Sequence, residues 1–313
     1  MKPLILEEDD LRNVNAAQTA VSAVRAAVEA HGRGLLIAPP RHQVDFDTGA
    51  LVFTVGGTAE VAGFRVYDTF PDSPEQQLVA VWDARTGVLE GIAVGDMVGA
   101  LRTGALGALA VDLMSNPDCK TCGVLGSGRQ ALTQLLCAST VRAFDEAIVY
   151  SPNRGRREQF ASDATELIGL PVRAVDTPEA AVRDVDVLIC ATSALQPAFD
   201  SEWLGLGTHV NTVGPKYKGA HELPIEVAEA ATLIATDSPQ QIAAQGDTHF
   251  LAGHESHDRV IDLADLIGET RSPRSVDGPT VFLSAGLAGT ETLVAHELLR
   301  EARQGTDGDE EKT

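Results

Sequence analysis

The chain has 313 residues, of which 44% are hydrophobic and 22% charged, as in a soluble globular protein with room for two domains. Its formal net charge of −21 repels phosphate backbones, so a nucleic-acid partner is not expected. The acidic first residues lack the apolar stretch of a signal peptide, and no apolar run reaches the roughly 18 residues of a membrane helix. We therefore expect a cytoplasmic protein without a membrane partner.

The first third of the chain mixes helices with short strands. Apolar residues recur at helical spacing over 11–34, and this segment ends in glycine, a common helix stop. Strands are expected at 50–57, 62–70 and 77–94, where an internal DARTG sequence predicts a hairpin turn. A helix rich in small residues should follow at 95–115.

The middle of the chain alternates short apolar runs with helical segments, a pattern that predicts βαβ units and a parallel sheet. Further strands are expected at 231–237 and 259–263. Residues 280–304 resemble a strand that enters a long amphipathic helix, and we expect this helix to pack back on the first domain.

The cysteine and histidine patterns do not predict a metal site. Cys119 and Cys122 have the spacing of zinc or redox cysteines, but no second Cys or His pair lies nearby to complete a tetrahedral site. We therefore favour reduced, structural thiols. His249, His254 and His257 lie near two acids, but their spacing fits no single helix face, so a loop is favoured over a metal centre.

The sequence VLGSGRQA follows one predicted strand and opens a predicted helix. Gly126 allows a tight turn, Gly128 lets the backbone approach a pyrophosphate, and Ala131 lets helix and strand pack closely. The helix N-terminus adds N–H donors and partial positive charge. This arrangement predicts a dinucleotide-binding Rossmann domain.

The end of the next strand bears on the choice of cofactor. An acid there would bind the ribose 2′-hydroxyl of NAD, but Ser151, Asn153 and Arg154 occupy the region. A hydroxyl and a guanidinium suit a 2′-phosphate, so NADP(H) is favoured over NAD(H). The alternative is that Arg154, Arg156 and Arg157 begin a solvated helix.

Several motifs together resemble the ornithine cyclodeaminase/mu-crystallin family, over about Leu4 to His296: PPRHQVDF, ALRTGALGALA, GVLGSGRQA, GTHVNTVG and HELP. The resemblance implies an α/β fold, with a Rossmann-type doubly wound parallel sheet at 116–282. It also implies a mixed α+β substrate and dimerisation domain formed from both chain ends, 1–115 with 283–313. The implied activity is NAD(P)(H)-dependent reduction of an α-imino acid of the ketimine or pyrroline-2-carboxylate type, or oxidation of the amino acid at its α-carbon, by a homodimer.

The resemblance also implies the site residues. Arg41 and Arg102 match the positions that bind the substrate carboxylate, for which a planar guanidinium is well suited. Without the resemblance, Arg41 is equally a surface loop residue and Arg102 a helix-face residue. The residues expected at the cofactor are Thr103, Gly126, Ser127, Gly128, Arg129, Gln130, Ser151, Asn153, Arg154, Thr192, Val213 and Gly214.

Two departures from the family pattern concern the catalytic residues. Arg65 stands where the family usually has a lysine, and it stays protonated. Lys216 stands where the cyclodeaminases have an aspartate. We predict Arg65 and Lys216 as catalytic residues, with Lys216 as the proton shuttle if the two share a pocket and if nearby cations and desolvation lower its pKa. The alternative is that Lys216 and Lys218 are solvated loop residues.

Three further interpretations stay open. His221 either faces the same cleft, or its HELP sequence begins a helix with Glu222 at the positive end. The activity could also be ornithine cyclodeamination, although the missing aspartate argues against it. Finally, the protein could bind NADPH without catalysis.

Overall fold

The structure, a computed structural model, describes residues 2–71, 77–268 and 277–310. The chain divides into two compact units, Met1–Arg102 with Leu287–Thr313 and Thr103–Gly286. The first boundary falls inside helix α2 (Met97–Met114), whereas the sequence analysis places it after this helix.

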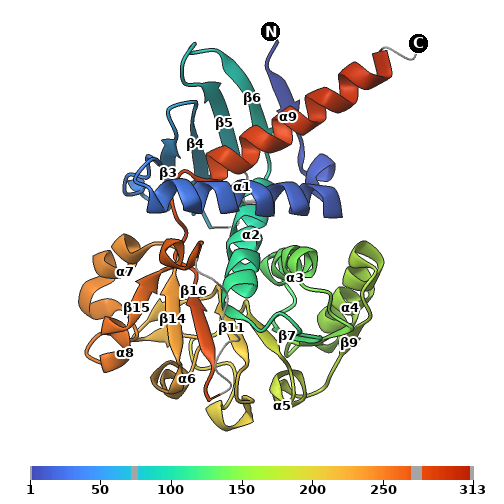
Figure 1. The fold of residues 1–313 in the computed structure, drawn as a ribbon, viewed down its shortest axis with the longest axis vertical. Coiled ribbons are helices and arrows are strands. Elements are labelled where there is room, and N and C mark those ends of the chain that lie inside the picture. Colours follow the sequence, from blue (N-terminus) through green and yellow to red (C-terminus); the bar gives the residue numbers. More distant parts are fainter. Residues whose placement is uncertain (1, 72–76, 269–276, 311–313) are drawn as a thin grey trace. The chain divides into compact units, whose positions relative to one another are not determined.

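The first unit contains a six-stranded sheet (Figure 1). Helix α9 packs across strands β3 to β6, and helix α1 packs against α9. At Gly63 the helix comes so close that a Cβ atom would lie 2.6 Å from the Thr292 side chain, so only glycine fits. The sheet order is β1-β6-β5-β4-β3-β2, and the elements are β1 (Leu4–Leu6), α1 (Val14–Gly32), β2 (His42–Phe46), β3 (Gly49–Gly57), β4 (Val61–Asp68), β5 (Gln77–Asp83), β6 (Leu89–Val94) and α9 (Thr290–Glu310).

Alternation along the strands explains which side of this sheet is covered. In β3, Ala50, Val52 and Thr54 are buried, while the residues between them are more exposed. The strand register places Arg65 of β4 beside Thr54 and Val79, which puts its side chain on the same face as these buried residues. The face that α9 covers therefore carries Arg65.

The second unit contains an eight-stranded, fully parallel sheet in the order β15-β14-β16-β11-β10-β7-β8-β9 (Figure 1). The strand order reverses beside β7, and such a reversal is the usual place for a ligand in this class of sheet. The elements are β7 (Thr121–Leu125), α3 (Arg129–Val141), β8 (Glu146–Tyr150), α4 (Arg154–Ile168), β9 (Val172–Ala174), α5 (Pro178–Val182), β10 (Val187–Cys190), β11 (His209–Thr212), the hairpin β12 (Lys216–Tyr217) and β13 (Ala220–His221), α6 (Ile225–Ala230), β14 (Leu233–Thr236), α7 (Pro239–Gln245), α8 (Glu255–Asp258), β15 (Val260–Asp262) and β16 (Thr280–Leu283).

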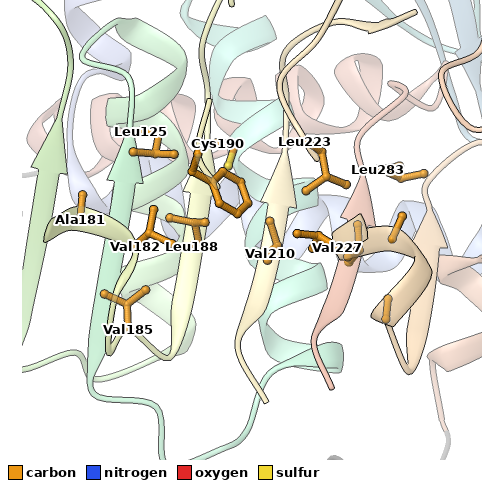
Figure 2. Close-up of a cluster of buried hydrophobic side chains, with 14 of the residues drawn as sticks. Leu125, Ala181, Val182, Val185, Leu188, Cys190, Val210, Leu223, Val227 and Leu283 are labelled. Atoms are coloured by element: carbon orange, nitrogen blue, oxygen red, sulfur yellow. The ribbon is translucent and has the colours of Figure 1, made fainter. Parts of the chain in front are cut away.

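Each face of this sheet has its own apolar core. On one face, Leu125 and Leu188 of the strands pack with Val182 of α5 and Val227 of α6 (Figure 2). Neighbouring strand residues such as Val124 point to the other face, where they pack with residues of α3 and α4. Burial on both faces explains why these strands are short, continuous apolar runs in the sequence.

The predicted α/β fold class is confirmed: one unit has a mixed sheet with helices, and the other a doubly wound parallel sheet. The helix predicted over 11–34 is α1, and the hairpin predicted within 77–94 is formed by β5 and β6. Strands β1 and β2 were not predicted.

From the sequence, no apolar run was expected to be long enough to cross a membrane, but helix α2 is. Its 18 residues have a mean hydropathy of 1.4, so it passes that test by length and composition. However, 89% of this stretch is buried inside the protein, and the buried helix of a soluble protein passes the same test. Its composition is explained by burial.

Candidate functional site

The glycine-rich loop follows β7 and leads into α3. Gly126 has φ of 113°, and a Cβ atom there would collide with the Ala191 carbonyl oxygen, so glycine is required by the turn itself. Gly128 is the N-cap residue of α3, and a Cβ atom there would meet nothing within 4 Å. The loop therefore has open space beside the helix N-terminus, where a pyrophosphate would be bound.

Hydrogen bonds connect this loop to the end of β8. The Ser127 hydroxyl donates to the Ser151 hydroxyl at 2.8 Å. The Asn153 side chain accepts a hydrogen bond from the Arg156 N–H at 3.0 Å and caps helix α4. Asn153 thus has a structural role of its own as a helix cap.

The three arginines after β8 differ in their surroundings. Arg154 is 76% exposed and pairs with Glu158 at 2.8 Å, and Arg156 is also exposed. Arg157 is buried, donates to the Ser151 carbonyl oxygen at 3.1 Å and forms an ion pair with Asp176. The interpretation of all three as a solvated helix start is therefore wrong for Arg157, whereas Arg154 and Arg156 are exposed.

Glu222 organises the segments that follow β10 and β11. Its carboxylate is fully buried and accepts hydrogen bonds from the N–H groups of Thr192, Val213 and Gly214 and from the Thr192 hydroxyl. Three residues predicted at the cofactor therefore donate their N–H groups to a protein carboxylate. Helix α6 begins only at Ile225, so Glu222 does not stand at its positive end as one interpretation proposed.

Lys216 lies on β12 and is only 6% exposed, so the interpretation as a solvated loop residue is wrong for it. Its Nζ donates to the Gly214 carbonyl oxygen at 2.9 Å. Burial lowers the pKa of Lys216 to about 8, although the charges of Glu222 and Asp237 oppose this shift. The pKa of Lys216 is therefore lowered, as predicted, but the cause is desolvation. The charged groups that act on it are acidic and not the cations that were expected. Lys218 is exposed.

A second buried carboxylate, Asp237, holds the neighbouring strand ends. It follows β14 directly and accepts hydrogen bonds from the N–H groups of Ala285 (2.6 Å) and Gly286 (2.8 Å), which follow β16. Like Glu222, it lies at the carboxyl edge of the parallel sheet, where ligands bind in this fold class.

In the first unit, two arginines share one buried carboxylate. Glu291 of α9 accepts hydrogen bonds from Arg102 Nη2 at 2.6 Å and Arg65 Nη1 at 3.3 Å. Arg65 also donates to Gln77 Oε1 and stacks on the Tyr67 ring, 4.5 Å from its centre. Although burial opposes it, the two guanidiniums hold the pKa of Glu291 below its ordinary value. Burial lowers the pKa of Arg65.

This arginine cluster has the donors that a small carboxylate needs. Arg102 is buried, and its Nε has no hydrogen-bond partner among the described residues. Arg41 is exposed, and its Nη1 lies 3.5 Å from the Tyr67 hydroxyl, which connects it to Arg65. The structure therefore brings Arg41, Arg65 and Arg102 into one chain of contacts, with Glu291 as a member that the sequence analysis missed.

The remaining candidates are structural. His221 Nδ1 lies 2.8 Å from the Leu223 carbonyl oxygen, and its ring stacks on Phe250. His249 is fully buried, and burial, assisted by His257 and Lys216, lowers its pKa to about 4. Within the described ranges, no three His, Cys, Asp or Glu side chains are placed to bind a metal ion. All four cysteines are reduced thiols and are buried.

The catalytic residues predicted from the sequence lie in different units. Arg65 belongs to the first unit, with Arg102 and Glu291, and Lys216 belongs to the second, with Glu222. That Arg65 and Lys216 share a pocket stays a prediction.

The parallel sheet of the second unit, with its glycine loop, defines a Rossmann-type nucleotide-binding protein, and the first unit carries the arginine cluster. The chain belongs to the ornithine cyclodeaminase/mu-crystallin family, whose family model matches residues 1–306. It is 27% identical to an alanine dehydrogenase of Archaeoglobus fulgidus, over 94% of both chains. It is 30% identical to the ketimine reductase mu-crystallin of Mus musculus, over 72% of this chain and 68% of the relative.

A solved structure shows the same fold. An archaeal alanine dehydrogenase dimer with bound NAD has a TM-score of 0.84 and 25% identity, and the match covers 98% of each chain. The resemblance stated from the sequence motifs is therefore confirmed over nearly the whole chain.

Proposed function

We propose that this protein is an NAD(P)(H)-dependent oxidoreductase that reduces an α-imino acid, or oxidises the corresponding amino acid at its α-carbon. The observation that carries the proposal is the family match over residues 1–306, joined to a glycine loop with open space at Gly128. The relatives named above act on an amino acid and on a ketimine, which are interconverted by hydride transfer at the same carbon.

The residues of the site suit a nicotinamide dinucleotide. The N–H groups at the start of α3, beside Gly128, would hold its pyrophosphate, and Ser127 and Ser151 lie next to this position. When bound, the cofactor supplies or accepts the hydride. We propose a preference for NADP(H), because Arg154, which follows β8, has an exposed guanidinium of the kind that binds a 2′-phosphate.

The arginine cluster would bind the substrate carboxylate. Arg102 offers its unpartnered Nε, and Arg41 offers an exposed guanidinium. Arg65 already donates to Gln77 and Glu291, so we assign it to orienting the cluster as well as to contacting the substrate. Because an arginine stays protonated, the proton that the imine nitrogen needs would come from Lys216, whose pKa of about 8 is suited to proton donation.

We also propose that the protein is a homodimer. The face of the six-stranded sheet opposite α9 carries exposed apolar side chains from four strands: Ile5, Val44, Phe46, Val55 and Val94. An apolar face of this kind is typical of a subunit interface. The archaeal alanine dehydrogenase that shares the fold is a dimer.

The test is a spectrophotometric assay of nicotinamide oxidation, first with NADPH and then with NADH. The panel contains pyrroline-2-carboxylate, piperideine-2-carboxylate, and pyruvate or oxaloacetate with ammonia, and ammonia release from ornithine is measured in parallel. Oxidation of the cofactor by at least one imino acid is expected. Ammonia release from ornithine without imino-acid reduction would indicate a cyclodeaminase, and cofactor binding without any turnover would indicate a non-catalytic binding protein.

A further inference from the structure

We propose that Glu222 is a positioning residue of the cofactor site, which holds the segments after β10 and β11 in a single arrangement. The inference rests on the dinucleotide-binding function proposed above, because these segments carry Thr192, Val213 and Gly214. Glu222 contacts these residues itself and needs no contact with the cofactor.

The hydrogen bonds of Glu222 are divided between the two segments. Oε2 accepts from the Thr192 N–H and hydroxyl, both at 2.8 Å, in the segment after β10. Oε1 accepts from the N–H groups of Val213 at 3.0 Å and Gly214 at 2.5 Å, in the segment after β11. A buried carboxylate needs hydrogen-bond donors for both of its oxygens. If one segment moved away, one oxygen of Glu222 would lose its donors. The carboxylate thus couples the two segments.

The glycine at position 214 is explained by this carboxylate. A Cβ atom there would lie 2.7 Å from the Glu222 carboxyl carbon and would collide with the Thr192 carbonyl oxygen. Glu222 thus occupies the space into which a side chain at position 214 would project, and that Gly214 also contacts the cofactor stays a prediction. The shape of this segment is therefore set from inside the protein, before any ligand arrives.

The charge of Glu222 is balanced locally. Lys216, two residues after Gly214, donates to the Gly214 carbonyl oxygen at 2.9 Å, and its ammonium group interacts favourably with Glu222 and Asp237. Asp237 in turn connects the ends of β14 and β16. In the sheet order β14-β16-β11-β10, two carboxylates thus connect the ends of four consecutive strands.

The test compares Glu222→Gln with the matched control Glu226→Gln, an exposed glutamate four residues later. Glutamine has the same size, but its amide NH₂ group would face backbone N–H donors, so it can satisfy only one segment. We expect at least tenfold weaker NADPH binding by cofactor fluorescence for Glu222→Gln in the folded protein, and unchanged binding for Glu226→Gln. Unchanged NADPH affinity in folded Glu222→Gln would overturn the proposal.

Amide hydrogen exchange measures the coupling without any ligand. In Glu222→Gln, the amides of Thr192, Val213 and Gly214 should exchange at least tenfold faster than in the wild type, while those of Ile189 and Val210 within the strands keep their rates. A uniform increase would mean general destabilisation and would also count against a positioning role.

If Glu222→Gln does not fold, Glu222→Asp decides, because it keeps the charge opposite Lys216 but is one methylene too short to reach both segments. NADPH affinity equal to the wild type would overturn the proposal, and a loss of affinity in the folded variant would support it. Failure of the wild type to reduce any imino acid would disprove the proposed activity and leave these results valid. A wild type that binds neither NADPH nor NADH would overturn the positioning role.

Discussion

Arg102 and Glu291 form a buried ion pair, 2.6 Å from Nη2 to Oε1, although 189 positions separate them in the sequence. The pair connects helix α2 to helix α9, and Arg65 shares the same carboxylate oxygen. The guanidiniums of buried Arg102 and partly buried Arg65 therefore share one negative charge.

Neutralising that charge should be costly. We expect Glu291→Gln to lower the free energy of unfolding by about 3–5 kcal/mol, the usual cost of removing one partner from a buried ion pair. Urea denaturation followed by circular dichroism measures this, with Glu297→Gln as control, because Glu297 pairs with the exposed Arg300 and should matter by less than about 1 kcal/mol. Equal losses of unfolding free energy for the two substitutions would contradict the buried ion pair between Arg102 and Glu291.

Arg154 should distinguish the two nicotinamide cofactors. Replacing it with alanine removes a guanidinium from the position proposed for the 2′-phosphate, so KM for NADPH should rise about tenfold or more, as for a lost charged hydrogen bond. KM for NADH should stay within about twofold, since NADH lacks this phosphate. Arg156→Ala on the same helix is the control. An equal rise in KM for NADPH and NADH in Arg154→Ala would argue against Arg154 as a ligand of the 2′-phosphate.

Lys216 should determine the alkaline limb of the activity profile. The protonated amine is the donor, so the rate of imine reduction should fall as pH rises through about 8, the pKa of this residue. Lys216→Met should remove this limb and lower kcat by about 10²-fold or more, the typical contribution of a general acid. Lys218→Met, in the same hairpin but exposed, should behave as the wild type. Turnover unaffected by Lys216→Met would exclude the shuttle.

His249 should make the protein sensitive to mild acid. Its folded-state pKa is about 4 and the ordinary value 6.5, so between these limits the unfolded chain binds a proton that the folded protein does not. Stability should therefore fall as pH is lowered from 6.5 towards 4. His249→Gln should lose part of this dependence when urea unfolding is compared at pH 7 and pH 5. The exposed His42→Gln should retain it, and identical pH dependence in all three proteins would refute the prediction.

A charge placed on the apolar sheet face should separate the proposed dimer. Val55 is 50% exposed on β3, on the face opposite α9, and Val55→Asp would have to bury a carboxylate in the interface. We expect a monomer by light scattering where the wild type is a dimer. Val88→Asp is the control, because Val88 is 46% exposed in the turn before β6. A dimeric Val55→Asp variant would place the interface elsewhere.

The sequence predicted those elements whose pattern is local. Helix α1 was found from its periodicity, strands β3 to β6 from short β-rich runs between turn residues, and the glycine loop from the spacing of Gly126, Gly128 and Ala131. Strand β2 was missed because it is short and all five of its residues are exposed, and β1 has only three residues. Both strands form because they pair with a neighbouring strand, and this pairing is not encoded in the local sequence.

The buried carboxylates were beyond prediction for a related reason. Glu291 pairs with residues 189 and 226 positions away, and nothing in its neighbourhood marks it as buried. Glu222 contacts Thr192 and Gly214, which only strand pairing brings together, and in the sequence it resembles a helix-start glutamate. Lys216 was noticed because it stands where the cyclodeaminases have an aspartate, but its pKa is lowered by burial and not by the nearby cations that were expected.

Helix α9 follows the nucleotide-binding unit in the sequence, although it covers the sheet that precedes this unit. The sheet of the first unit is complete by Val94, but the helix that covers its inner face, including Val52 and Val79, begins only at Thr290. On the ribosome, the whole nucleotide-binding unit is synthesised in between and can fold first, since domains generally fold as units during translation. The apolar face of the earlier sheet must stay soluble throughout that time, so a chain interrupted before Thr290 should be recognised by chaperones as unfinished.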